Sequence, residues 1–225
     1  MLYGKLSSES ESYQKARAAL LEAEMALRDQ RERVAELRRA LPLDTPIDDY
    51  LFHEGPSDLQ KDSPISEIRL SELFEDPSKP LLIYQYMFGG AQNESCPMCA
   101  MWTDGFNAIT PHLKQRVNFA IVAQGEITEL RAWARRRHWS NLRLISSAGS
   151  SFKTDLHFQN SKEEQFPGVS VFVKSQDGPL RHFYSASAIM KDSEYRGIDL
   201  LTPVWNLLDL TPQGRGDWFP SVQYG

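Results

Sequence analysis

The sequence predicts an α/β protein in which helices flank a mixed β-sheet. Short apolar runs, typical of buried strands, alternate with stretches whose apolar residues fall three or four positions apart, as on one face of a helix. This alternation favours a parallel core. Two neighbouring strand-like runs near the C-terminus add an antiparallel hairpin. The length of 225 residues suits one large domain, or one domain with an appendage.

The first helix is predicted over residues 13–41, where Pro42 ends it. Apolar side chains recur at every seventh position of this stretch, namely Tyr13, Leu20, Leu27, Val34 and Leu41. Such a seam favours either a coiled coil that joins two copies of the chain through Tyr13 to Leu41, or an amphipathic helix that packs on its own domain. We therefore expect an N-terminal helical extension, residues 1–45, and one domain, residues 46–225.

The first part of the domain predicts two strands. A connector rich in proline and acidic residues leads to a short strand near Tyr50–His53. Ile68–Phe74 favours a short helix or turn, with Ser71 as its N-cap. Leu81–Phe88 is apolar and rich in Ile, Tyr and Phe, which is typical of a buried strand. A loop of glycine and polar residues, Gly89–Ser95, then leads to the two cysteines of the chain.

The alternation continues after the cysteines. An apolar stripe directly behind them predicts a helix, and Thr128–His138 predicts another with Thr128 as its N-cap. The remaining expected elements are strands at Val117–Ala123, Leu142–Ser146, Val169–Lys174 and Leu180–Ser185, a Gln-Asp-Gly-Pro turn at 176–179, and a last helix at Leu200–Leu210.

The segment Cys96-Pro97-Met98-Cys99 lies between a predicted strand and a predicted helix. In this context two cysteines separated by two residues are typical of a thioredoxin-like redox pair. Pro97 suits the first helical position because it has no N–H to satisfy, which places Cys96 at the N-cap. Free N–H groups and the positive end of the helix favour a thiolate there. Cys99 falls on the apolar stripe, so we expect Cys96 to attack a disulfide and the shielded Cys99 to resolve the intermediate.

Two other interpretations of the cysteines stay open. They are either structural residues without chemistry or two ligands of a zinc site, although zinc usually takes four ligands and the five histidines form no close pair in the sequence. The redox interpretation needs no bound cofactor and no metal. It does need an external partner, which we expect to be a thiol or disulfide protein or a low-molecular-weight thiol.

The composition of the chain argues against several classes of binding partner and against secretion. A net charge of -5 argues against nucleic acid and against anionic membranes as partners. Two cysteines exclude a disulfide-rich secreted scaffold. The first residues lack the apolar core of a secretory signal, and the longest apolar run, Pro80–Phe88, is too short to span a bilayer. We therefore expect a cytoplasmic protein.

Several separated segments carry a family resemblance. They are MFGGAQNESCPMCAMWTDGFN (Met87–Asn107), FPGVSVFV (Phe166–Val173), RGIDLL (Arg196–Leu201), LLDLTPQGR (Leu207–Arg215) and the helix ending LRRALP (Leu37–Pro42). Over nearly its whole length the chain resembles a thioredoxin-like family known as domain of unknown function 899. The resemblance implies a thioredoxin fold with a peroxiredoxin-like layout and no established reaction. It also implies that Cys96 and Cys99 are the redox pair and that Pro167 is a cis-proline facing them, where a substrate chain pairs with its backbone.

The sequence also departs from ordinary thioredoxins. Ser95 replaces the usual tryptophan, Pro-Met replaces Gly-Pro between the cysteines, and Leu81–Phe88 contains no carboxylate to accept a proton from the second thiol. Asp104 and Glu94 are candidates for that role, although both residues are typical of surface charges. The leading hypothesis is a thiol–disulfide oxidoreductase. A thiol peroxidase of peroxiredoxin-like type and a non-catalytic redox-sensing or binding module remain alternatives.

Two weaker features favour structural roles. The basic aromatic cluster Trp133–Trp139 predicts a core tryptophan beside arginines on a wet helix face, rather than a surface that stacks bases. His157 lies in an irregular segment and is a candidate acid or base, but a lone histidine is more often structural.

Overall fold

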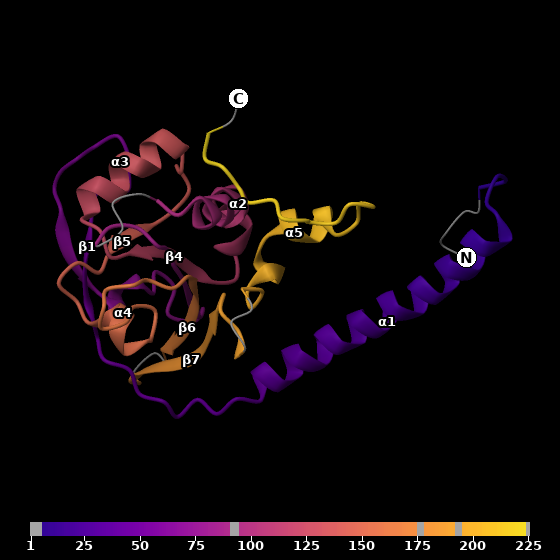
Figure 1. Ribbon diagram of the computed structural model, residues 1–225. Coiled ribbons are helices and arrows are strands. Elements are labelled where there is room, and N and C mark those ends of the chain that lie inside the picture. The colour runs from indigo at the N-terminus through magenta and orange to yellow at the C-terminus, as the bar shows by residue number, and fades with distance from the viewer. Residues whose placement is uncertain (1–5, 91–94, 175–177, 192–194, 224–225) are drawn as a thin grey trace. The chain divides into compact units, whose positions relative to one another are not determined.

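The computed structural model describes residues 6–90, 95–174, 178–191 and 195–223 (Figure 1). Glu94 and part of the turn predicted at 176–179 lie outside the described residues. Contacts divide the chain into two units, Met1–Pro42 and Leu43–Gly225. We describe each unit by itself.

The first unit contains one long helix, α1 (Glu11–Arg39), close to the range predicted from the heptad spacing. The Ser10 side chain caps it by accepting a hydrogen bond from the N–H of Tyr13 at 3.2 Å. An acidic first turn and a basic last turn match the helix dipole. No residue of α1 is buried, and the heptad positions Leu20 and Leu27 are 51% and 61% exposed. The seam is therefore open to solvent.

In the part of the second unit that the structure describes, the strands form a seven-stranded mixed sheet, which confirms the α/β prediction. The strands lie in the order β2-β1-β5-β4-β3-β6-β7. The centre is parallel and consists of β3 (Leu81–Gln85), β4 (Asn118–Ala123) and β5 (Leu144–Ser146). The flanking strands are antiparallel: β1 (Leu51–Glu54), β2 (Ser66–Arg69), β6 (Gly168–Lys174) and β7 (Leu180–Ser187). The predicted hairpin is the pair β6–β7.

Alternating side chains of the central strands divide the core into two clusters. Tyr84 and Ile121 belong to the cluster covered by α2 (Pro97–Leu113) and α3 (Ile127–Arg137). Their neighbours Ile83 and Val122 belong to the other cluster. That cluster is completed by the short helix α4 (Phe152–Asp155) and the 3-10 turn η1 (Leu70–Leu73). Helices thus cover both faces of the sheet (Figure 1). Both cysteines belong to the cluster on the α2 side.

Some predicted helix boundaries are wrong. The helix predicted from Thr128 begins at Ile127, with Glu126 at its N-cap. The first two residues of the segment predicted as a short helix or turn at 68–74 belong to β2, and η1 follows with Arg69 rather than Ser71 at its N-cap. There the Glu72 carboxylate accepts a hydrogen bond from the Arg69 N–H at 2.7 Å, which fixes the start of the turn.

The last predicted helix is split into two elements. A 3-10 turn, η3 (Asp199–Leu201), ends before a new helix, α5 (Pro203–Leu208). The physical reason is Pro203, which disfavours helical backbone at the residue before it and itself suits the first position of a helix. Across the described part of the chain, no helix is long and apolar enough to cross a membrane.

Candidate functional site

Cys96 stands at the N-cap of α2, and Pro97 occupies the first turn, as the sequence predicted. The backbone of Cys96 is extended (φ -62°, ψ 119°), so the chain enters the helix directly at this residue. Cys96 is half-buried and Cys99 is fully buried, and both are free thiols. The half-buried position leaves Cys96 as the accessible member of the pair.

The surroundings of Cys96 favour its thiolate. The largest effect is a hydrogen bond from the Cys99 thiol to the Cys96 sulfur, and the N–H groups of Cys99 and Met98 also donate toward it. Together they outweigh partial burial and lower the pKa of Cys96 from 9.0 to about 6. At neutral pH most of the Cys96 population is therefore ionised.

Cys99 has the opposite environment. Burial is the largest effect and raises the pKa of the Cys99 thiol well above 9.0, and the neighbouring Cys96 raises it further. The backbone N–H of Met87 donates toward the Cys99 sulfur and works in the other direction. Near neutral pH the pair therefore consists of one thiolate and one thiol that donates to it.

Tyr86 joins the end of the β3 segment to the residue before the cysteines. Its hydroxyl accepts a hydrogen bond from the Trp133 indole N–H at 2.8 Å and shares a short one with the Ser95 hydroxyl. Burial is the main reason that the pKa of Tyr86 lies far above 10, so the phenol stays neutral. Trp133, predicted to be a core residue, thus also fixes the position of Ser95 through Tyr86.

A cavity of about 690 Å³ opens beside α3. Its wall includes Ser95, which directly precedes Cys96, and the partly buried Trp133. The other lining residues are Phe88, Gly89, Gly90, Glu129, Ala132, Arg136, Val222 and Gln223. Arg136 stacks on the Trp133 ring, with the guanidinium carbon 5.1 Å from the ring centroid. The cavity offers a space of ligand size at the residue that directly precedes Cys96.

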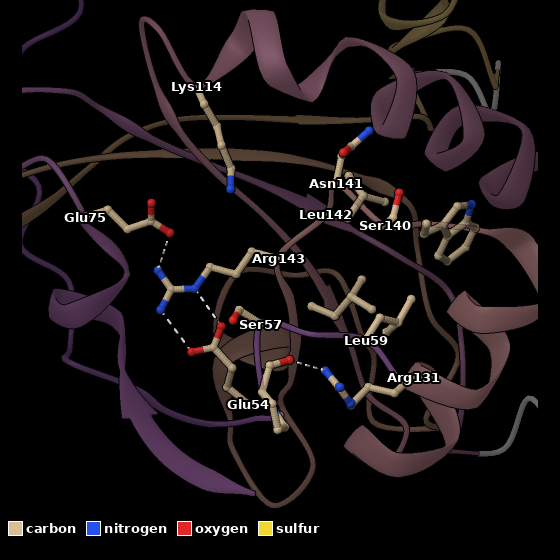
Figure 2. Close-up of a pocket in the computed structure, with 14 residues that line it drawn as sticks. Glu54, Ser57, Leu59, Glu75, Lys114, Arg131, Ser140, Asn141, Leu142 and Arg143 are labelled. Atoms are coloured by element: carbon tan, nitrogen blue, oxygen red, sulfur yellow. Dashed lines mark hydrogen bonds and ion pairs between the residues drawn. The ribbon is translucent and has the colours of Figure 1, made fainter. Parts of the chain in front are cut away.

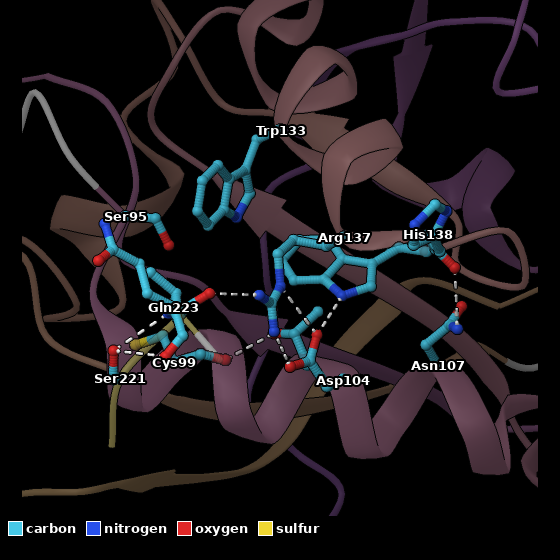
Figure 3. Close-up of polar contacts among 12 residues, drawn as sticks. Ser95, Cys99, Asp104, Asn107, Trp133, Arg137, His138, Ser221 and Gln223 are labelled. Carbon is cyan, nitrogen blue, oxygen red and sulfur yellow. Dashed lines mark hydrogen bonds and ion pairs between the residues drawn. The ribbon is translucent and has the colours of Figure 1, made fainter. Parts of the chain in front are cut away.

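A polar network ties α2 to α3 close to this cavity (Figure 3). Asp104 accepts hydrogen bonds from the Arg137 guanidinium and from the Trp139 indole, the latter at 2.7 Å. Arg137 also donates to the Val222 carbonyl at 3.1 Å, so it holds the C-terminal segment. Asp104 is therefore a structural partner of Arg137 rather than a surface charge, and Arg137 is not part of a wet helix face.

One buried residue of the site was not singled out from the sequence. Lys153 of α4 is fully buried, and its ammonium donates to the Tyr86 carbonyl at 2.8 Å and to the Gln165 side chain at 2.9 Å. Gln165 in turn donates to the Gly89 carbonyl at 2.7 Å. No local pattern marks Lys153, because the segment around it is mixed and polar.

The expectation of a cis-proline at position 167 is wrong. Among the described residues the cis peptide bond is Ser63–Pro64, so the bond before Pro167 is trans. An X–Pro bond prefers trans by about 0.5–1 kcal/mol, and here the chain leads straight into β6 without a tight turn. Pro167 is buried, and its carbonyl already accepts a backbone hydrogen bond from Ala188 at 2.9 Å.

Other candidates lie apart from the cysteines. His157 is exposed, at the end of α4. A smaller cavity of about 300 Å³ has neither cysteine in its wall, and there Arg143 pairs with Glu54 at 2.7 Å and with Glu75 at 3.3 Å (Figure 2). Within the described ranges, no three His, Cys, Asp or Glu side chains gather in a way that could hold a metal ion.

The chain is similar to solved structures of peroxiredoxins, one of them with a TM-score of 0.50. The *Plasmodium falciparum* antioxidant protein, a 1-Cys peroxiredoxin, matches with a TM-score of 0.50 and 14% identity, over 69% of this chain and 88% of its own. *Mycobacterium tuberculosis* AhpC matches with a TM-score of 0.46 and 13% identity, over 75% and 99%. Reduced Prx3 from *Vibrio vulnificus*, in complex with hydrogen peroxide, matches with a TM-score of 0.47 and 11% identity, over 72% and 94%. The fold is thus thioredoxin-like, as the sequence predicted.

The chain also matches one family across almost its full length. No curated protein sequence matches it. A family model described as "Bacterial protein of unknown function" matches residues 5–224, which agrees with the resemblance noted in the sequence. Since that match covers far more than half of the chain, the protein belongs to this family, DUF899.

Proposed function

We propose that the protein is a thiol–disulfide oxidoreductase in which Cys96 attacks a disulfide and Cys99 resolves the intermediate. The observation that carries the proposal is the pair of opposite pKa shifts at the start of α2. A half-buried Cys96 with a pKa of about 6 is a nucleophile at neutral pH, while the buried Cys99 stays a thiol until it is needed.

The proposed reaction has two steps. The Cys96 thiolate attacks one sulfur of a substrate disulfide, the substrate S–S bond breaks, and the departing sulfur leaves as a thiolate. Cys99 then loses its proton and attacks the Cys96 sulfur. The mixed disulfide breaks, a Cys96–Cys99 disulfide forms, and the second substrate sulfur leaves. Two electrons pass from the protein to the substrate, and an external thiol restores the reduced pair.

The cavity beside Ser95 supports access for such a substrate, because its wall includes the residue directly before Cys96 and both apolar and charged side chains. We keep a disulfide protein or a low-molecular-weight disulfide as the proposed partner, and the cytoplasm as the proposed location. A reducing compartment keeps both cysteines as thiols between turnovers.

The test compares the reduced chain with Cys96→Ser and Cys99→Ser. Each protein is mixed with 5,5′-dithiobis(2-nitrobenzoate), a chromogenic disulfide, and release of its thiolate is followed by absorbance. The unmodified chain should release two thiolates, and Cys99→Ser should release one and retain the other in a mixed disulfide visible by mass. Cys96→Ser should react at least about 100-fold more slowly at pH 7, because its remaining thiol is buried and protonated.

The same proteins distinguish peroxide reduction. Hydrogen peroxide would oxidise Cys96 to a sulfenic acid, which Cys99 would condense into the same disulfide with loss of water. We expect the second-order rate with the disulfide to exceed the rate with peroxide. A faster reaction with peroxide would assign the pair to peroxidase chemistry, and an unchanged rate in Cys96→Ser would refute Cys96 as the attacking residue.

A further inference from the structure

Lys153 is a fully buried basic side chain on the carbonyl side of the Tyr86–Met87 peptide group. It forms no ion pair with any carboxylate in the described part of the chain. Its nitrogen donates to two acceptors, the Tyr86 carbonyl and the Gln165 side-chain oxygen. A buried ammonium is costly unless it is paired. A site that retains one therefore calls for an explanation.

The peptide group between Tyr86 and Met87 links this lysine to Cys99. Its carbonyl oxygen accepts the hydrogen bond from Lys153 at 2.8 Å, and its N–H donates toward the Cys99 sulfur. Donor and acceptor of one peptide group polarise each other, so a positive charge at the oxygen makes the N–H a stronger donor. An electrostatic interaction between Lys153 and Cys99 acts in the same sense.

We propose that Lys153 is a positioning residue for the resolving step, in which its charge stabilises the thiolate of Cys99 through the Tyr86–Met87 peptide group. The inference rests on the proposed function, since it concerns the second of the two steps. The strand segment 81–88 contains no carboxylate that could assist the ionisation of the buried Cys99 thiol. In this proposal Lys153 provides that assistance.

The step balances without any further reactant. Cys99 releases its proton to solvent, its thiolate forms a bond to the Cys96 sulfur, and the bond from Cys96 to the substrate sulfur breaks. The electron pair leaves on the substrate sulfur, which takes up a proton from solvent if its own pKa requires it. Lys153 neither forms nor breaks a covalent bond in this sequence.

Of the other titratable groups around Cys99, the Tyr84 side chain also lowers the pKa of the thiol, but none of these groups changes its charge near neutral pH in the mixed disulfide. They are Cys96 at the start of α2, and Tyr84 and Tyr86 from the β3 segment. In the mixed disulfide Cys96 carries no charge. Burial is the first cause that raises the pKa of both tyrosines, so both phenols are neutral below pH 10. Lys153 is then the group whose charge changes near neutral pH, because burial lowers its pKa to about 7.

This coupling predicts a distinctive pH profile for the resolving step. Below pH 7 the rate should rise about tenfold per pH unit as Cys99 ionises beside the charged lysine. Near pH 7 the Cys99–Lys153 pair loses the first of its two protons. Above that pH the rate should level off, because the remaining proton is distributed between Cys99 and Lys153 in a constant ratio. If no cation assisted the buried thiol, the rate of the resolving step would instead rise tenfold per pH unit to beyond pH 9.

The experiment uses the second phase of the chromogenic reaction, in which Cys99 releases the thiolate held on Cys96. The phase is timed by stopped flow from pH 5.5 to 9.5 in the unmodified chain, Lys153→Met and Lys153→Gln. Lys162→Met serves as the matched control, because Lys162 is exposed. Thermal unfolding confirms that each variant is folded.

We expect both Lys153 variants to lose the bend and to resolve on the order of 10- to 1000-fold more slowly at pH 7, with the deficit shrinking toward pH 9.5. The glutamine of Lys153→Gln still provides an N–H donor. A slow second phase in this variant would therefore show that the positive charge of Lys153, and not only its hydrogen bond, is needed. The first phase, which reports Cys96, should stay within about twofold in every variant. Failure of that phase in the unmodified chain would refute the proposed function instead.

Three results would overturn the inference. They are a second phase that superimposes on the unmodified chain in either Lys153 variant, a loss of the same size in Lys162→Met, and a profile of the unmodified chain that rises without a bend from pH 5.5 to 9.5. The last result needs no variant, so the inference stays testable even if the substitutions prevent folding.

Discussion

At the residue scale, burial and hydrogen bonding separate two chemically identical cysteines. The Cys99 thiol donates to the Cys96 sulfur and thereby lowers the pKa of Cys96 to about 6, while burial raises that of Cys99. The sequence predicted this difference from local features alone, since helix starts favour thiolates and an apolar stripe shields the residue three positions on. It did not identify Lys153, which approaches Cys99 from a different element.

The Asp104 carboxylate provides the first prediction at this scale. It accepts from Arg137 and from Trp139, and the two ends of its ion pair are 30% and 11% exposed. Asp104→Asn should lower the free energy of unfolding by about 2–4 kcal/mol, because it removes the carboxylate charge that pairs with the shielded Arg137 guanidinium. Urea unfolding of the reduced protein measures the change.

Asp62→Asn is the matched control for this substitution. Asp62 also pairs with an α3 arginine, Arg135, but its side chain is 73% exposed. We expect a loss of at most about 1 kcal/mol, because solvent screens such pairs. Equal losses in both variants would show that the Asp104 network adds nothing to stability beyond an ordinary surface pair.

At the element scale, the helices and strands follow the apolar periodicity of the sequence, and the errors occur where a single residue decides. Pro203 splits the last predicted helix into η3 and α5, and Arg69 rather than Ser71 precedes η1. Periodicity reports which face of an element is buried but carries little information about its ends, which depend on capping contacts. The Pro167 isomer is the same kind of error, because the isomer depends on the path of the chain around it.

The heptad seam of α1 gives a prediction at this scale. Leu20 and Leu27 are exposed within the chain, and we propose that a second copy covers them in a coiled coil. Leu20→Glu combined with Leu27→Glu should raise the dimer dissociation constant at least about 100-fold, because four charges would enter the seam of the dimer. Sedimentation velocity over a range of protein concentrations measures it.

Ala18→Glu combined with Met25→Glu is the control, since it adds the same two charges at positions two residues before the seam. This variant should associate like the unmodified chain. A chain that sediments as a monomer at every concentration would contradict self-association through α1.

At the scale of the whole molecule, the shifted thiol and amine make stability depend on pH. The pKa of Lys153 falls from 10.5 to about 7 on folding, and that of Cys96 falls from 9.0 to about 6. Between pH 7 and 9 the unfolded chain therefore binds more protons than the folded chain at both residues. Stability must rise with pH wherever the unfolded state binds more protons.

We accordingly expect the free energy of unfolding of the reduced protein to increase from pH 7 to pH 9. Each of the two groups contributes a slope of up to about 1.4 kcal/mol per pH unit. Lys153→Met should remove about half of the increase, and Lys162→Met should preserve it. Urea unfolding at several pH values measures both, and a flat curve for the unmodified reduced protein would contradict the burial of a neutral lysine.

The sequence by itself determined the alternation of strands and helices, the cysteine pair at the start of a helix and the difference between its two members. These features depend on residues close together in the chain, so local spacing is enough to specify them. Only the tertiary structure decided that Lys153 from α4 meets the peptide group behind Cys99, and that Asp104 is held by Arg137. Contacts between distant segments form when the sheet and its covering helices pack together, and no local pattern in a single sequence encodes which side chains then meet.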